Sequence, residues 1–179
     1  MQSSKSKKSI QWDKYMVYII FVAVFVLFAI ILRDDGFLNP NNIVNILRQT
    51  AMISIMAVAG TFVMAAGQID LTVGSITAMT AMLVALVLSA TNSIILALAV
   101  GLGFGCCIGL INGVLVTKLK LPAFLATLGM MQIVRGGAMW ITDTAAVPIT
   151  NSTFNQVFGI GTVFGIPVLV LWTALFYII

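Results

Sequence analysis

The chain has 179 residues, of which 61% are hydrophobic and 8% are charged. Soluble domains carry about 25% charged residues, so this composition excludes a soluble globular domain and indicates an integral membrane protein. The absence of histidine excludes a histidine-based metal site or catalytic triad, and no cofactor is predicted. The net charge of +4 requires no nucleic-acid partner, because the basic residues lie where membrane topology places them. The adjacent Cys106 and Cys107 are interpreted as small packing residues.

Six apolar runs follow one another along the chain. A helix needs roughly 20 residues to cross the hydrocarbon core, and the runs lack the alternation and short length of membrane β-strands. The predicted fold is therefore an all-α, polytopic transmembrane helix bundle of about six spans, with a basic cytoplasmic segment 1–14 before a membrane domain 15–179. The runs cover roughly residues 15–32, 50–67, 72–90, 93–117, 122–141 and 162–179.

Lysine and arginine indicate the orientation, because they concentrate on the cytoplasmic side of a membrane. The first run follows KSKK and Lys14, is too long for a usual signal peptide and lacks a cleavage site, so we interpret it as an uncleaved signal anchor. With the N-terminus in the cytoplasm, four crossings return the chain to the cytoplasm at Lys118 and Lys120, and residues 142–158 lie outside. This orientation leaves six basic residues inside and two outside, apart from Arg135 in the fifth run.

The segment FLNPNNIVNILRQ lies between the first two runs. Asn39 is a good N-cap, and Pro40 suits the first position of a helix. Apolar residues then recur at spacings of three and four. The segment is either a short amphipathic helix on the outer surface or the first turns of the second span.

A polar interruption, AAGQIDLTVGS, separates the second and third runs at residues 65–75. Gly67 can end one helix, and Asp70 or Thr72 can cap the next, where the helix dipole also favours a carboxylate. We therefore predict a broken helix junction near Gly67–Thr72. Asp70 either serves only this junction or belongs to a discontinuous backbone that lines a translocation route, because unwound backbone at membrane depth requires surrounding protein or water. The other candidates for these roles in this stretch are Gln68, Thr72 and Ser75.

The fourth run carries a pattern of small residues. Glycine recurs there at every fourth position, at Gly101, Gly105, Gly109 and Gly113. Such spacing lets a neighbouring helix approach closely, either inside one bundle or at a dimerisation face. Asn112 lies beside this face and needs a hydrogen-bond partner in the apolar phase, so it is also a pathway candidate.

The fifth run contains Arg135, which we expect in the outer half of the membrane. Its side chain either extends to the interface or faces the bundle interior with Gln132 one turn away. Placing a polar or ionisable side chain inside a membrane costs free energy. Both residues are therefore candidates for the pathway.

Taken together, these residues resemble a known family. GQIDLTVGS is similar to the G-I-D-L-S-V-G-S signature of bacterial sugar ABC-importer permeases of the ribose, galactose and autoinducer-2 group. FLNPNNIVNILRQTAMISIMAVAGTFVMAAG and GLINGVLVTKLKLPAFLATLGMMQIVRGGAMWIT resemble the segments before and after that signature, so the resemblance covers nearly the whole chain. Gln68, before Ile69, departs from the family pattern and adds a polar side chain at the break.

The resemblance implies a membrane-spanning permease subunit of an ATP-driven sugar importer in the bacterial inner membrane, which forms part of the translocation pathway and is not itself an enzyme. The implied partners are a second permease chain, identical or different, cytoplasmic ATP-binding subunits and a periplasmic sugar-binding protein, besides the lipid bilayer. The chain lacks a G-x-x-x-x-G-K-[ST] phosphate loop, in agreement with ATP hydrolysis in a separate subunit. The resemblance does not identify the sugar.

Members of that family continue with further spans, and these include the segment that contacts the ATPase. We therefore expect this chain to be the N-terminal part of a permease. Two other functions stay open at this point. One is half of a secondary transporter, which also has broken helices but usually carries more intramembrane carboxylates. The other is a non-transporting, truncated membrane or assembly subunit.

Overall fold

The computed structural model describes the backbone of residues 12–178 and the side chains of residues 15–178, so the predicted basic segment 1–14 lies outside the residues described in full. The chain divides between Ile46 and Leu47 into two compact units. Its elements are α1 (Trp12–Ile31), α2 (Pro40–Ala65), α3 (Val73–Thr91), α4 (Ile94–Thr117), α5 (Ala123–Thr142), α6 (Ser152–Phe158), β1 (Thr162–Val163), β2 (Ile166–Pro167) and α7 (Val168–Ile178).

The predicted all-α fold is confirmed, since each of the six apolar runs contains a helix and the strands described form one small hairpin. Four helices, α2 to α5, are long and apolar enough to cross a membrane. The apolar parts described for α1 and α7, Tyr15–Ile31 and Val168–Ile178, are shorter. Length and composition therefore support four of the roughly six predicted spans directly.

The start predicted for the sixth run is wrong. Helix α7 begins at Val168, and the residues before it form a hairpin in which Thr162 pairs with Pro167. Gly165 adopts a φ of +81°, which glycine tolerates and other residues avoid. Pro167 has no N–H for a preceding helical turn. A tight turn therefore replaces the first helical residues that hydropathy alone predicts.

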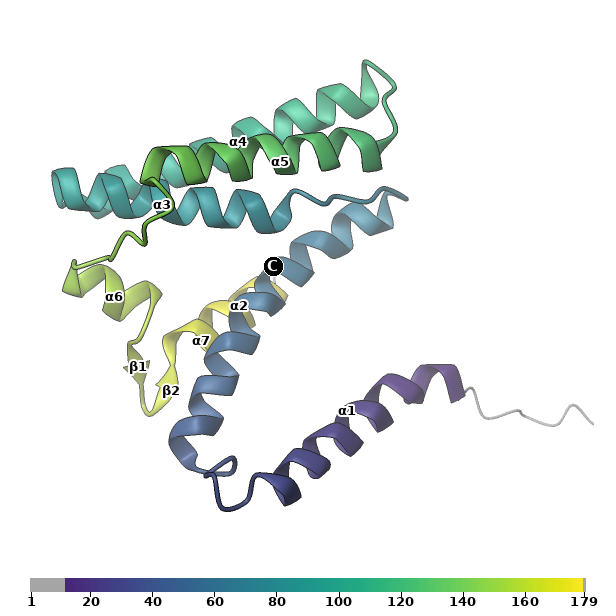
Figure 1. Ribbon diagram of the computed structural model, residues 1–179, viewed down its shortest axis with the longest axis vertical. Helices are drawn as coiled ribbons and strands as arrows, with labels where there is room; N and C mark the ends of the chain where they lie inside the picture. The colour runs from purple at the N-terminus through teal and green to yellow at the C-terminus, as the bar shows by residue number, and fades with distance from the viewer. Residues whose placement is uncertain (1–11, 179) are drawn as a thin grey trace, which may run out of the picture. The chain divides into compact units, whose positions relative to one another are not determined.

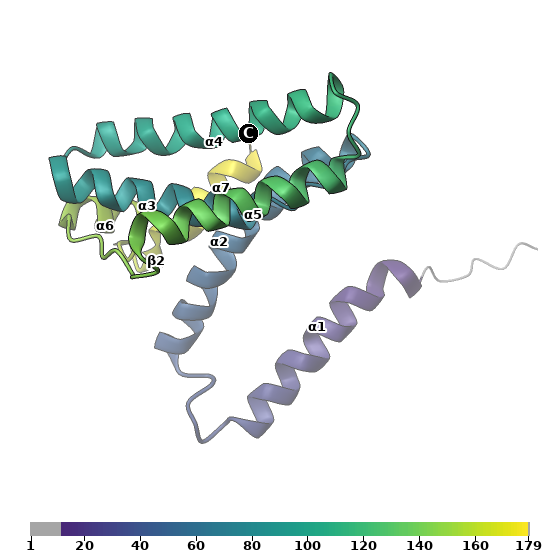
Figure 2. The same cartoon turned by 45° about the horizontal axis from the view of Figure 1, so that its top comes forward.

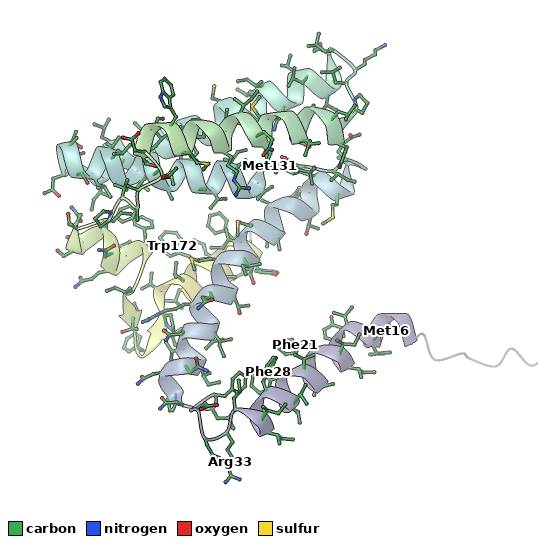
Figure 3. The ribbon with its side chains drawn as sticks, viewed as in Figure 1. Met16, Phe21, Phe28, Arg33, Met131 and Trp172 are labelled. Carbon is green, nitrogen blue, oxygen red and sulfur yellow. The ribbon has the colours of Figure 1, made fainter. Side chains whose placement is uncertain are left out.

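Aromatic side chains close the turn after α1 in the first unit. Phe37 packs against Phe25 and Phe28, with ring centroids 5.5 and 6.1 Å apart. Phe28 is labelled on α1 in Figure 3. These contacts pack the turn against the C-terminal half of α1.

The start of α2 agrees with the sequence. The side chain of Asn39 accepts a hydrogen bond from the N–H of Asn41 at 3.0 Å, and Pro40 is the first helical residue. The helix then continues without interruption to Ala65. The residues after Pro40 are therefore the first turns of the second predicted span, and the alternative of a separate amphipathic helix is wrong.

Helices α3, α4 and α5 lie side by side and form the main bundle of the second unit (Figure 1; Figure 2). α3 and α5 begin at the end of the bundle where α4 finishes. One apolar cluster joins all three helices, and a second joins α3, α4 and the segment that follows α5. The buried members are Met79, Ile108, Val134 and Ala138 in the first cluster and Val84, Leu88 and Ala97 in the second.

The short helix α6 packs against α7. Trp172 of α7, labelled in Figure 3, donates its indole N–H to the carbonyl of Val157 at 2.9 Å. Its ring stacks on Phe158 with a centroid distance of 5.5 Å. Thr173 donates to the carbonyl of Ala51 at 3.1 Å, which ties α7 to α2.

Candidate functional site

The polar interruption is a true helix break. Gly67, just beyond the last residue of α2, has a φ of +70°, and its N–H donates to the carbonyl of Met64 at 2.9 Å. The N–H of Gln68 donates to the carbonyl of Val63 at 3.2 Å. These bonds satisfy the last carbonyls of the helix, as expected where a left-handed glycine ends it. The predicted junction near Gly67–Thr72 is thus confirmed, and α3 begins at Val73.

Asp70 organises the residues between the two helices. One carboxylate oxygen, Oδ1, accepts the backbone N–H of Thr72 at 2.7 Å and also the hydroxyl of Thr72. This is a local turn in which an aspartate binds the backbone two residues later. Thr72 stands at the N-cap position of α3, but its side chain makes no cap bond there, because its hydroxyl is directed to Asp70. Asp70 thus stabilises the entry to α3 by a turn rather than by direct capping.

Two neighbouring helices hold this segment in place. Asn112 of α4 donates its side-chain N–H to the hydroxyl of Thr72 at 3.1 Å. The hydroxyl of Thr127 of α5 lies 3.4 Å from the carbonyl of Ile69, while its proton is donated at 2.8 Å to the carbonyl of Ala123 within α5. Thr72 is fully buried, and Asn112 is 6% exposed. The Thr72 end of the break is therefore packed into the end of the bundle, whereas Gly67, Gln68 and Ile69 are exposed.

Ser75 belongs to the same buried group, whereas Gln68 does not. The hydroxyl of Ser75 donates to the carbonyl of Thr72 at 2.9 Å. Gln68 is exposed beside the break. The structure thus brings together four of the predicted residues, Asp70, Thr72, Ser75 and Asn112.

Arg135 and Gln132 lie elsewhere. Both are exposed on α5. Among the residues described, neither side chain makes a hydrogen bond. A pathway role for Arg135 and Gln132 stays a prediction, as does the alternative of an arginine that extends to the interface.

Residues 42–179 match the model of a family described as "Branched-chain amino acid transport system / permease component". The chain belongs to this permease family. Together with the four long apolar helices, membership makes it a multi-pass protein of the bacterial inner membrane.

Several curated proteins are similar to this permease chain. The ribose import permease protein RbsC of Haemophilus influenzae is 42% identical over 154 residues, which cover 83% of this chain and 47% of RbsC. RbsC of Bacillus subtilis is 38% identical over 183 residues, or 99% of this chain and 56% of RbsC. The L-arabinose ABC transporter permease protein AraH of Azospirillum brasilense is 34% identical over 150 residues, which cover 84% of this chain and 43% of AraH. The chain spans about half the length of these relatives, and no solved structure matches it.

The glycine pattern of the permease divides between two faces of α4. A Cβ atom on Gly101 would lie 2.8 Å from Cγ2 of Val84, so α3 approaches closely there. At Gly105, Gly109 and Gly113 a Cβ atom would meet nothing within 4 Å among the residues described. Each step of four residues turns a helix by about 40° beyond a full turn, so the pattern drifts off the contact face after Gly101. Packing of the later three glycines against another helix stays a prediction.

Cys106 and Cys107 also lie off the contact face. Both are free and exposed, which differs from the packing role expected from the sequence. The buried residues of α4 are Ala97, Gly101, Ile108 and Asn112, and neither cysteine belongs to this buried row.

Sequence reasoning missed two polar contributions. Thr127 stands in an apolar run without a distinctive motif, and only its position opposite Ile69 gives it a role. Asn151 accepts the N–H of Phe154 at 2.8 Å as the N-cap of α6 and donates to the side chain of Asn92 at 2.7 Å. The capping pattern of Asn151 was readable in the sequence, but its bond to the α3–α4 turn was not.

Proposed function

We propose that this chain is a membrane-spanning permease subunit of an ATP-driven sugar importer and forms part of its translocation pathway. The observation that carries the proposal is the 38% identity to a ribose import permease across 99% of the chain. Two further relatives, RbsC of Haemophilus influenzae and AraH of Azospirillum brasilense, are named for ribose import and L-arabinose transport. A pentose, with ribose first, is therefore the substrate to test.

The proposed partners are a second permease chain, cytoplasmic ATP-binding subunits and a periplasmic sugar-binding protein. ATP hydrolysis would take place in the ATP-binding subunits. The permease would convert their motion into movement of the sugar. The open glycine face of α4, formed by Gly105, Gly109 and Gly113, supports a close approach by a further helix. We infer that this helix comes from the rest of the assembled transporter.

The polar group at the helix break is the proposed element of the pathway. Asp70, Thr72, Ser75 and Asn112 place hydrogen-bonding groups beside non-helical backbone, which a membrane tolerates only next to protein or water. Gln68, Gln132 and Arg135 are exposed polar residues of the same unit and are proposed to face either the route or the membrane interface.

We also propose that the N-terminus and the loop with Lys118 and Lys120 lie in the cytoplasm. The helix break shares one end of the bundle with that loop, because Thr72 contacts Asn112 near the end of α4 and Ile69 contacts Thr127 near the start of α5. The break would accordingly lie near the cytoplasmic side.

Reconstitution tests this function. The permease is placed in liposomes with its ATP-binding and sugar-binding partners, and uptake of radiolabelled ribose is measured with and without ATP. We expect uptake that requires ATP and the binding protein. Uptake driven by an ion gradient in the absence of both would instead identify a secondary transporter.

A further inference from the structure

The hydrogen bonds at the helix break form a chain with a fixed direction. The side-chain nitrogen of Asn112 can only donate, so Thr72 Oγ1 accepts its bond. The single hydroxyl proton of Thr72 is then available to Asp70 Oδ1. With the Asn112 amide turned round, its oxygen would take the hydroxyl proton, and Thr72 Oγ1 would face Asp70 Oδ1 without a proton between them. The direction from α4 to the break therefore follows from the chemistry of the three groups.

The two oxygens of the Asp70 carboxylate differ in their hydrogen-bond partners. Oδ1 receives both the N–H and the hydroxyl of Thr72. No donor among the residues described reaches Oδ2. Oδ2 is also not buried, in contrast to Asn112 Oδ1, which is buried without a partner. A carboxylate oxygen can accept more than one hydrogen bond, so Oδ2 is an open, charged acceptor whose position is fixed by its neighbour.

We propose that Asp70 Oδ2 accepts hydrogen bonds from the hydroxyl groups of the transported sugar, and that Asn112, acting through Thr72, is the positioning residue for this acceptor. The inference rests on the proposed importer function and assigns one of its substrate contacts. Sugars carry many hydroxyl donors, and a fixed carboxylate oxygen is a strong partner for them because hydrogen bonds to charged groups exceed neutral ones in strength. Asn112 Oδ1 is buried without a partner among the residues described, and such an atom normally destabilises a fold.

The first experiment isolates Oδ2. Asp70→Asn keeps an acceptor oxygen for the two bonds of Thr72 and replaces the open oxygen with an amide that can only donate. In the assembled transporter we expect an unchanged melting temperature and ribose uptake reduced by roughly tenfold or more, as for loss of one bond to a charged acceptor. Wild-type uptake by this variant at matched membrane levels would overturn the inference.

The second experiment tests the positioning role. Asn112→Leu removes the donor together with the unpaired buried oxygen, so we expect a melting temperature close to that of the wild type but reduced uptake. Thr72→Ser keeps the hydroxyl and should retain uptake, whereas Thr72→Val keeps the shape without the hydroxyl and should lose it. Wild-type uptake by Asn112→Leu or Thr72→Val would contradict the positioning role.

These outcomes are distinct from a failure of the proposed function. If the wild-type transporter shows no ATP-dependent ribose uptake, the importer function is wrong and so is the sugar contact. If the wild type transports ribose and Asp70→Asn does so equally well, only the sugar contact is wrong.

Discussion

At the scale of single residues, Asp70 has a structural contribution that can be measured apart from transport. Its Oδ1 holds the N–H and hydroxyl of Thr72 at the entry to α3. Asp70→Ala removes this acceptor, and we expect it to lower the free energy of unfolding by about 1–3 kcal/mol, the usual cost of leaving a buried donor without its partner. Asp70→Asn retains the acceptor and should unfold at nearly the wild-type temperature. Thermal unfolding of the two purified transporters in detergent compares them. Equal stability of Asp70→Ala and the wild type would show that the turn contributes nothing.

Gly101 gives a second test at this scale, with Gly105 as its matched control. A Cβ at position 101 would approach Val84 Cγ2 at 2.8 Å and Thr80 Cγ2 at 3.1 Å, whereas one at position 105 would meet nothing within 4 Å in the part of the chain described. We expect Gly101→Ala to reduce stability by about 1–3 kcal/mol through overpacking, and Gly105→Ala to reduce it less. Melting temperatures of both variants provide the measurement. A larger effect at position 105 would mean that the tightest contact of α4 is made with another chain or segment.

At the scale of secondary-structure elements, α6 depends on Asn151 for its position. This side chain caps α6 and binds Asn92 in the turn between α3 and α4. Phe154 of α6 also packs on the cluster that contains Leu88. A seven-residue helix is too short to be stable alone, so these contacts hold it in place.

We therefore expect Asn151→Ala to release α6, while Asn151→Ser keeps a capping oxygen and loses only the bond to Asn92. Amide hydrogen exchange over residues 152–158 in the assembled transporter distinguishes these effects. Exchange should be fastest in Asn151→Ala and intermediate in Asn151→Ser. Equal protection in the wild type and both variants would show that packing of Phe154 alone docks the helix.

At the scale of the whole molecule, the open question is orientation in the membrane. The six basic residues assigned to the cytoplasmic side favour a cytoplasmic N-terminus and a cytoplasmic loop at Lys118. Single cysteines at positions Ser4, Lys118 and Ser152, in a background without Cys106 and Cys107, can be treated with a membrane-impermeant reagent in intact cells. We expect labelling at position 152 alone. Labelling of position 118 from outside would reverse the proposed topology.

Some features of the whole molecule follow from local sequence, and others require the assembled fold. Helix locations followed from hydropathy, because the membrane requires long apolar helices with their backbone bonds satisfied internally. The start of α2 at Pro40 and the break at Gly67 followed from residues with special backbone requirements. The hairpin before α7 was missed, since Gly165 and Pro167 override the apolar character of their neighbours.

The candidate site was only partly predictable for a physical reason. The sequence by itself marked Asp70 as an isolated carboxylate at a helix junction and Asn112 as an amide that needs a partner. Only the tertiary structure decided that these two residues share Thr72, because the residues of that bond are 40 positions apart and meet only when α3 and α4 pack. It likewise decided that Gly101 is in contact and that Gly105 is open within the chain, since a four-residue repeat drifts around a helix of 3.6 residues per turn. Local patterns determine where a helix begins and ends, whereas the rotation of each helix against its neighbours determines which polar groups meet.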